Sequence, residues 1–174
     1  MSKAGERKSA QASIAVLTRR SGELLARIDR DTTDEQRNWR PEPDAWSIVE
    51  IVQHIALATG SIFRTTRPAS GRLRWTGAVK SALLTGVLRS RIKIRAPVPA
   101  IVPRPGVTWE EAQIRMKAAA ARWAEFVASD SFDDTAFKHP LTGRITAAQT
   151  ATFVVEHFDH HVRQIDRIFA KVAS

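Results

Sequence analysis

The chain has 174 residues, enough for one domain and short for two. It contains no cysteine, which excludes a disulfide framework, a thiolate metal site, an iron–sulfur cluster and a cysteine nucleophile. With 43% hydrophobic residues, eight glycines and eight prolines, the composition is typical of a folded globular protein and excludes disordered and collagen-like chains. The apolar runs are too short for a signal peptide or a membrane span, so we expect a cytoplasmic protein.

The positive charge lies in the middle of the chain. The formal net charge is +9, yet no acidic residue occurs between Glu50 and Glu110. The basic residues of this stretch are Arg64, Arg67, Arg72, Arg74, Lys80, Arg89, Arg91, Lys93, Arg95 and Arg104. The rest of the chain is nearly neutral, so the whole excess belongs to this basic middle segment. Such a segment favours nucleic acid, an anionic membrane surface or an anionic small molecule as a partner, although a solvated face is the more common outcome.

Apolar spacing and capping signals predict four long helices. The first runs from about residue 5 to residue 28, and a connector with one short turn after Thr33 follows. Capping boxes at Ser47–Glu50, Thr108–Glu111 and Thr146–Gln149 each precede apolar residues spaced three or four apart, the period of an amphipathic helix. The expected core residues of the first helix are Ile14, Leu17, Leu24, Leu25 and Ile28.

The segment between the second and third long helices is predicted to be an insertion. Residues 78–92 have the spacing of an extra helix, and the proline-rich residues 96–105 are expected to be extended. No strand is predicted anywhere. The sequence therefore predicts one all-α domain over residues 1–174, a four-helix bundle with a basic, proline-rich insertion at about 68–106.

Three of the five histidines form a candidate metal site. His157 and His161 are four residues apart, so both rings project from one face of the last helix. His161 continues its apolar stripe, and His54 lies at the edge of the apolar stripe of the second helix. If these helices face each other, the three rings converge inside the bundle. Three neutral imidazoles with an open fourth position are typical of a catalytic metal site, whereas the alternative for each is a hydrogen-bonded core histidine.

Other polar residues near these histidines have two interpretations each. Glu50 and Asp159 are candidates to orient ligating imidazoles, or they are exposed helix charges. Gln164 is a candidate partner of a ligand or a substrate, or a surface residue. His139 is assigned to a loop at the rim of the site.

The order of four motifs resembles the DinB/YfiT-like superfamily of metal-dependent proteins. Residues Trp39–Pro41 and Ala45–His54 resemble the family's entry into its second helix and its first ligand. His139–Gly143 resembles the turn before the last helix, and His157–Ile165 resembles the second and third ligands with their trailing glutamine. The similarity spans most of the chain outside the basic middle segment.

The resemblance implies an up-down-down-up bundle, frequently a homodimer, with Zn²⁺ or Ni²⁺ held by His54, His157 and His161. Characterised members of the family include transferases that use a low-molecular-weight thiol, so the resemblance implies a thiol and an electrophilic small molecule as partners. Two further hypotheses stand beside this S-transferase. In one, the protein is a non-catalytic module that binds nucleic acid, an anionic membrane or a protein through its basic middle segment. In the other, the histidines hold a metal for stability alone.

Overall fold

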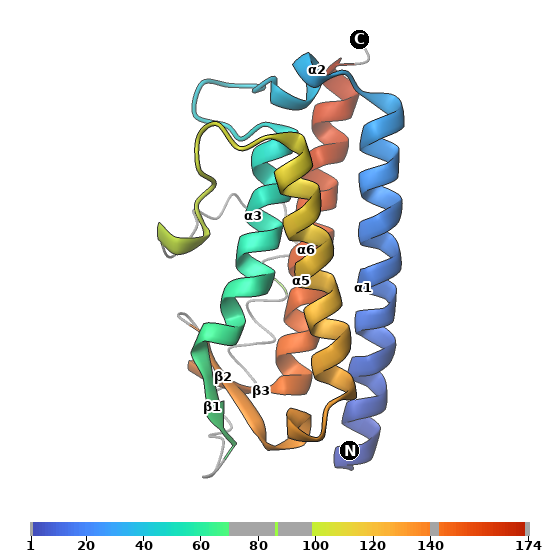
Figure 1. Cartoon of the computed structure of the whole chain (residues 1–174), viewed down its shortest axis with the longest axis vertical. Coiled ribbons are helices and arrows are strands. Elements are labelled where there is room, and N and C mark those ends of the chain that lie inside the picture. Colours follow the sequence, from blue (N-terminus) through green and yellow to red (C-terminus); the bar gives the residue numbers. More distant parts are fainter. Residues whose placement is uncertain (1, 70–85, 87–98, 140–142, 173–174) are drawn as a thin grey trace.

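Four long helices pack side by side in the computed structural model, which describes residues 2–69, 86, 99–139 and 143–172. They are α1 (Lys3–Asp31), α3 (Ile48–Ser61), α5 (Trp109–Ala128) and α6 (Ala147–Val172). In Figure 1, α1 and α6 run upward and α3 and α5 run downward. This arrangement confirms the predicted all-α, up-down-down-up bundle.

The direction of α3 and α5 explains why an insertion separates them. α3 ends at the lower end of the bundle and α5 starts at its upper end (Figure 1). Two parallel neighbours cannot be joined by a short turn, so the connection has to cover the length of the bundle. The other junctions join elements at the same end, and there short connections suffice.

Side-chain caps fix where the helices begin. Ser47 and Glu50 form the predicted reciprocal capping box at the start of α3. Thr146 and Gln149 form another at the start of α6, with bonds of 3.0 and 3.1 Å. At α5 the Thr108 side chain accepts from the Glu111 N–H at 3.2 Å, which is one half of the predicted box.

α1 and α3 occupy opposite corners of the bundle, and each packs against both α5 and α6. The core lies between these four helices. All five residues predicted to face inward from α1 are buried. The largest fully buried side chain among the described residues is that of Trp123 in α5, which is 0% exposed. Its ring lies 5.1 Å from Phe63, 5.7 Å from Phe126 and 5.8 Å from Phe137, between ring centres. These four rings form an aromatic cluster within the core.

A small antiparallel sheet closes the lower end of the bundle, and the expectation of no strand was wrong. Strands β1 (Thr66–Pro68), β2 (Thr135–His139) and β3 (Gly143–Thr146) pair in that order. Phe137 pairs with Thr66 on one side and with Ile145 on the other. Phe137 and Ile145 are both 1% exposed, so burial of this face stabilises strands that are too short to be stable alone. The short helix η3 (Asp130–Asp134) leads from α5 into β2.

The remaining connections agree only in part with the predictions made from the sequence. The predicted turn after Thr33 is the short helix α2 (Asp34–Asn38). The short helix η1 (Ile62–Thr65) precedes the insertion, and η2 (Pro99–Ile101) lies in its last part. η2 corrects the expectation that residues 96–105 are extended throughout. The predicted helix over 78–92 lies outside the described residues, apart from Gly86. Among the helices that the structure describes, none is long and apolar enough to cross a membrane.

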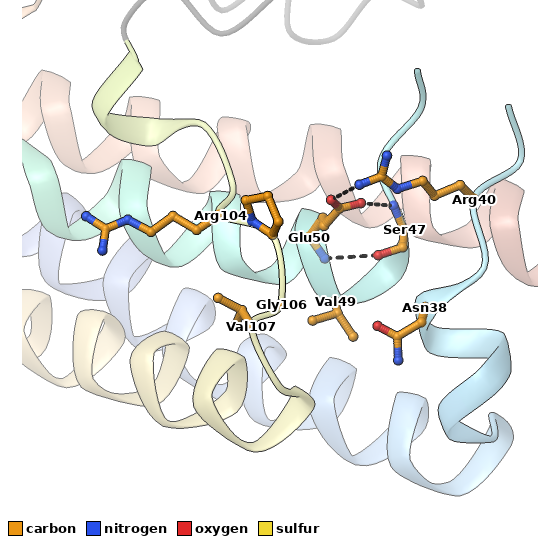
Figure 2. A pocket seen from close by; sticks show the side chains of 9 residues that line it. Asn38, Arg40, Ser47, Val49, Glu50, Arg104, Gly106 and Val107 are labelled. Carbon is orange, nitrogen blue, oxygen red and sulfur yellow. Dashed lines mark hydrogen bonds and ion pairs between the residues drawn. The ribbon is translucent and has the colours of Figure 1, made fainter. Parts of the chain in front are cut away.

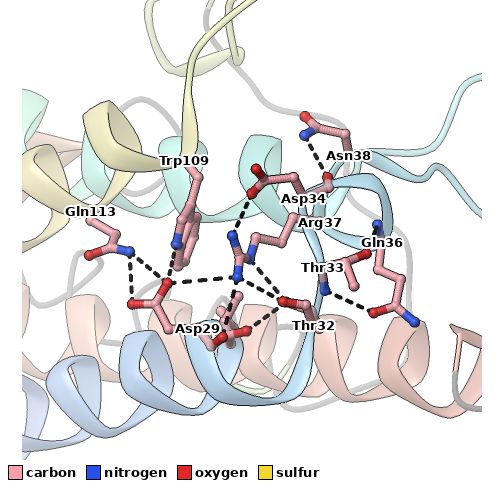
Figure 3. Close-up of polar contacts among 10 residues, drawn as sticks. Asp29, Thr32, Thr33, Asp34, Gln36, Arg37, Asn38, Trp109 and Gln113 are labelled. Carbon is pink, nitrogen blue, oxygen red and sulfur yellow. Dashed lines mark hydrogen bonds and ion pairs between the residues drawn. The ribbon is translucent and has the colours of Figure 1, made fainter.

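A polar junction joins α1, α2 and α5 at the upper end of the bundle (Figure 3). The Arg37 guanidinium donates to the Thr32 carbonyl at 2.7 Å, to the Asp29 carbonyl at 3.3 Å and to the Asp34 carboxylate at 2.6 Å. The Trp109 indole N–H donates to the Asp29 carboxylate at 2.6 Å, and Arg37 lies over the Trp109 ring. Arg37 therefore satisfies carbonyl groups at the end of α1 that have no partner within the helix.

Replacing Arg37 by alanine should lower the free energy of unfolding by about 2–3 kcal/mol, because several bonds to one charged group are lost together. Arg30→Ala is the matched control, since Arg30 is exposed and pairs with its neighbour Asp31 at the surface. Its effect should be about 0.5 kcal/mol or less. Urea denaturation measures both values, and equal losses would show that the junction does not stabilise the fold.

Candidate metal centre

His54, His157 and His161 lie together between α3 and α6, the convergence expected if these two helices face each other. His54 Nε2 and His157 Nε2 are 3.2 Å apart, and His161 Nε2 and His157 Nε2 are also 3.2 Å apart. The ligand atoms of all three residues lie within 4.8 Å of one another. In the described part of the chain this is the one group of three or more histidine or acidic side chains with such spacing. One ring from α3 thus meets two rings that lie one turn apart on α6.

Two of the rings are oriented by oxygen atoms on their far side. His54 Nδ1 lies 2.7 Å from the Ile101 carbonyl oxygen, and His161 Nδ1 lies 3.0 Å from Gln164 Oε1. Both oxygens are acceptors, so each ring places its proton on Nδ1 and donates it outward. The Nε2 lone pairs of His54 and His161 are therefore directed at His157. Histidine ligands of metals are commonly fixed in this way.

The donor set cannot be satisfied by hydrogen bonds within the triad alone. His157 Nε2 carries at most one proton, and it lies 3.2 Å from two acceptor nitrogens. At most one of the two contacts can then be a hydrogen bond, and the lone pair of the other nitrogen receives no proton from His157. A divalent cation at this point would accept a lone pair from each of the three rings. The residues therefore fit a transition-metal ion such as Zn²⁺ or Ni²⁺, which imidazole binds well.

Burial keeps the three rings neutral. Desolvation lowers the pKa of His54, and it lowers the pKa of His157 well below the usual range, with neighbouring histidines adding to the effect. Desolvation, followed by the charge of His54, lowers the pKa of His161 to about 3. Neutral imidazole is the form that binds metals, so protons compete weakly for this site at neutral pH.

Aromatic rings form the wall of the site. The Trp46 ring lies 4.7 Å from the His54 ring, and Phe153 stacks on His157 at 5.8 Å. The His139 ring lies edge-on to Phe153, with 4.7 Å between ring centres. His139 is the last residue of β2, which corrects its assignment to a loop. Phe153 therefore contacts both His139 and His157, a member of the triad.

The candidate orienting residues have different partners. Gln164 contacts His161, as one of its two interpretations expected. Asp159 instead forms an ion pair with Arg20 of α1. Glu50 accepts from the Ser47 N–H in the capping box and from Arg40. His160 presents its ring edge-on to His161 at 5.0 Å.

Neither the Ile101 carbonyl nor the ring of Trp46 was predicted at the site from the sequence. A backbone carbonyl has no residue-type signal, and Trp46 precedes its helix, so helical spacing does not connect it with His54.

A separate pocket lies near the start of α3 (Figure 2). It has a volume of about 160 Å³ and includes no histidine. Its lining residues are Asn38, Arg40, Ser47, Val49, Glu50, Arg104, Pro105, Gly106 and Val107. The ion pair of Arg40 with Glu50 lies at its edge, so Glu50 faces this pocket and the helix cap.

Replacing Gln164 by leucine should weaken metal binding by about 10-fold or more, because His161 loses the acceptor that holds its Nδ1 proton. Gln164→Glu keeps an oxygen acceptor at this position and should bind more tightly than the leucine variant. Competition with a metal-indicator dye measures both affinities. Equal affinities in the wild type and the leucine variant would show that Gln164 does not orient the ligand.

The fold and the three converging histidines define this chain as a four-helix-bundle protein with a candidate metal centre between its second and fourth long helices. The chain belongs to the DinB superfamily, whose family model matches residues 7–165. Among solved structures it is similar to YfiT from Bacillus subtilis, described as a probable metal-dependent hydrolase with an unusual four-helix bundle topology. The TM-score is 0.52 at 15% sequence identity, over 99% of this chain and 90% of that chain. No match was found among curated proteins.

Proposed function

We propose that His54, His157 and His161 bind one divalent transition metal, Zn²⁺ or Ni²⁺, and that the site is catalytic. The observation that carries this proposal is the arrangement of the three Nε2 atoms, two of which have lone pairs directed inward by hydrogen bonds at Nδ1. Three nitrogen ligands leave a coordination position for a substrate, as in catalytic rather than structural zinc sites.

The reaction that we propose is transfer of a low-molecular-weight thiol to an electrophilic small molecule. A metal held by neutral ligands lowers the pKa of a bound thiol and favours the nucleophilic thiolate. The chain has no cysteine, so the sulfur must come from a second substrate. In the transfer, sulfur forms a bond to an electrophilic carbon, the leaving group takes the bonding electrons, and the thiol proton passes to solvent.

The polar surroundings of the triad favour this proposal over hydrolysis. Hydrolysis at a metal site often uses a general base, as the glutamate of zinc metalloproteases shows. Glu50 and Asp159, the two acidic residues that the sequence offers as orienting candidates, are engaged by Arg40 and Arg20. Thiol transfer needs no such base, because the metal itself favours loss of the thiol proton. The aromatic wall of Trp46 and Phe153 suits an apolar electrophile.

The test is a titration of Co²⁺-loaded protein with glutathione, cysteine and coenzyme A. We expect one of these thiols to produce a near-ultraviolet thiolate-to-metal absorption band, and His161→Ala to show none. Turnover is followed with chlorodinitrobenzene for thiol transfer and with nitrophenyl acetate for hydrolysis. Ester hydrolysis without any thiol band would replace the transferase with a hydrolase. Neither a band nor turnover in metal-loaded protein would contradict a catalytic site.

A further inference from the structure

The last part of the insertion lies on α3 and contacts two adjacent side chains there. Residues Pro99–Arg104, the return segment, begin with η2, where the Val102 N–H donates to the Pro99 carbonyl at 3.1 Å. The carbonyl of Ile101 accepts from His54 Nδ1 at 2.7 Å. Three residues later, the Arg104 N–H donates to Gln53 Oε1 at 2.8 Å. Consecutive residues of α3 thus hold both ends of a short stretch of backbone.

Gln53 is an unusual residue for its environment. Its side chain is 0% exposed, and its Nε2 has no hydrogen-bond partner among the described residues. A buried amide with one unsatisfied group destabilises a fold, and an apolar residue would avoid this cost. The bond from Oε1 to the return segment gives the amide a role that an apolar side chain lacks.

We propose that Gln53 is a positioning residue that acts on the metal centre through the return segment. Gln53 fixes the Arg104 end of the segment, and the turn from Pro99 to Val102 fixes the other end. Ile101 and Pro103 are buried between these points, and the prolines restrict the backbone. The Ile101 carbonyl is thereby held where it keeps the His54 proton on Nδ1 and leaves Nε2 as the ligand.

This inference rests on the proposed function, because it assumes that His54 is a metal ligand. It adds a coupling between the metal and a part of the chain outside the helices. If the docked segment favours metal binding, metal binding must favour the docked segment by the same factor. The end of the basic middle segment would then respond to metal occupancy.

The test combines hydrogen exchange with metal affinity. In the wild type, Zn²⁺ should slow amide exchange in residues 99–107 several-fold. Gln53→Met, which keeps the side-chain volume and removes the acceptor, should weaken Zn²⁺ binding by about 10-fold and abolish that protection. Arg104→Ala is the matched control, because it keeps the backbone N–H that Gln53 binds and should leave both values unchanged. Wild-type affinity and protection in Gln53→Met would overturn the proposal.

The tautomer of His54 separates this inference from the metal proposal. Long-range ¹H–¹⁵N spectra of metal-free protein should show His54 protonated at Nδ1 in the wild type and in Arg104→Ala. In Gln53→Met a mixture of tautomers is expected. An unchanged tautomer in Gln53→Met would overturn the positioning role even if the protein bound metal. If no metal binds but the tautomer shifts, the proposed function fails while the effect of Gln53 on His54 stands.

Discussion

Replacing His161 by alanine should lower the affinity for Zn²⁺ by more than about 100-fold, beyond the 10- to 100-fold range typical of residues that only orient a ligand. His161 is 6% exposed and contributes one of the three converging nitrogens. Without it, His54 and His157 alone cannot complete a three-nitrogen site. The affinities are measured by competition with a chelator of known strength, on protein purified without a histidine tag.

His160→Ala is the control for this variant. His160 is adjacent in sequence and its ring contacts His161, yet it does not belong to the group of converging nitrogens. Zn²⁺ should raise the melting temperature of the wild type and of His160→Ala, because a ligand that binds only the folded state stabilises it. It should not raise that of His161→Ala. Similar affinities for the two variants would remove His161 from the site.

Replacing Trp123 by alanine should lower the free energy of unfolding by about 3–5 kcal/mol. The ring is fully buried among Phe63, Phe126 and Phe137, and its indole N–H donates to the Thr59 carbonyl at 3.1 Å. The substitution leaves a cavity and removes the hydrogen bond from the indole to the Thr59 carbonyl. Urea denaturation followed by circular dichroism measures the loss.

Trp123→Phe separates the two contributions. It keeps an aromatic ring in the cluster and removes the indole N–H, so it should cost about 1–3 kcal/mol. A loss below about 1 kcal/mol for Trp123→Ala would mean that the cluster collapses around the cavity or does not stabilise the bundle.

The helices could be predicted because their signals are local. Apolar residues at helical spacing and the caps at Ser47 and Thr146 each lie within a few positions of the structure that they specify. The sheet could not be predicted in this way. β1 pairs with β2 across the whole insertion and α5, and β2, from Thr135 to His139, is short and shows no alternation of buried and exposed residues.

The site shows the same division between local and distant signals. His157 and His161 are related by one helical turn, and His54 is grouped with them by its place at the edge of an apolar stripe and by the resemblance to the DinB family. The partner of His54 is a backbone carbonyl at the end of the insertion, and the burial of Gln53 depends on that docking. Neither contact is encoded by a residue type or a spacing, so only the folded chain reveals them.

Binding of one divalent metal ion by three imidazoles of one chain underlies the proposed chemistry and the role of Gln53 alike. X-ray absorption at the zinc edge, on Zn²⁺-loaded protein that lacks a histidine tag, reports the metal content and the ligand atoms together. We expect one zinc per chain, with imidazole nitrogens at about 2.0–2.1 Å in the wild type and fewer of them in His161→Ala. Substoichiometric zinc under saturating conditions, or a shell of oxygen atoms without imidazole scattering, would contradict the three-histidine site.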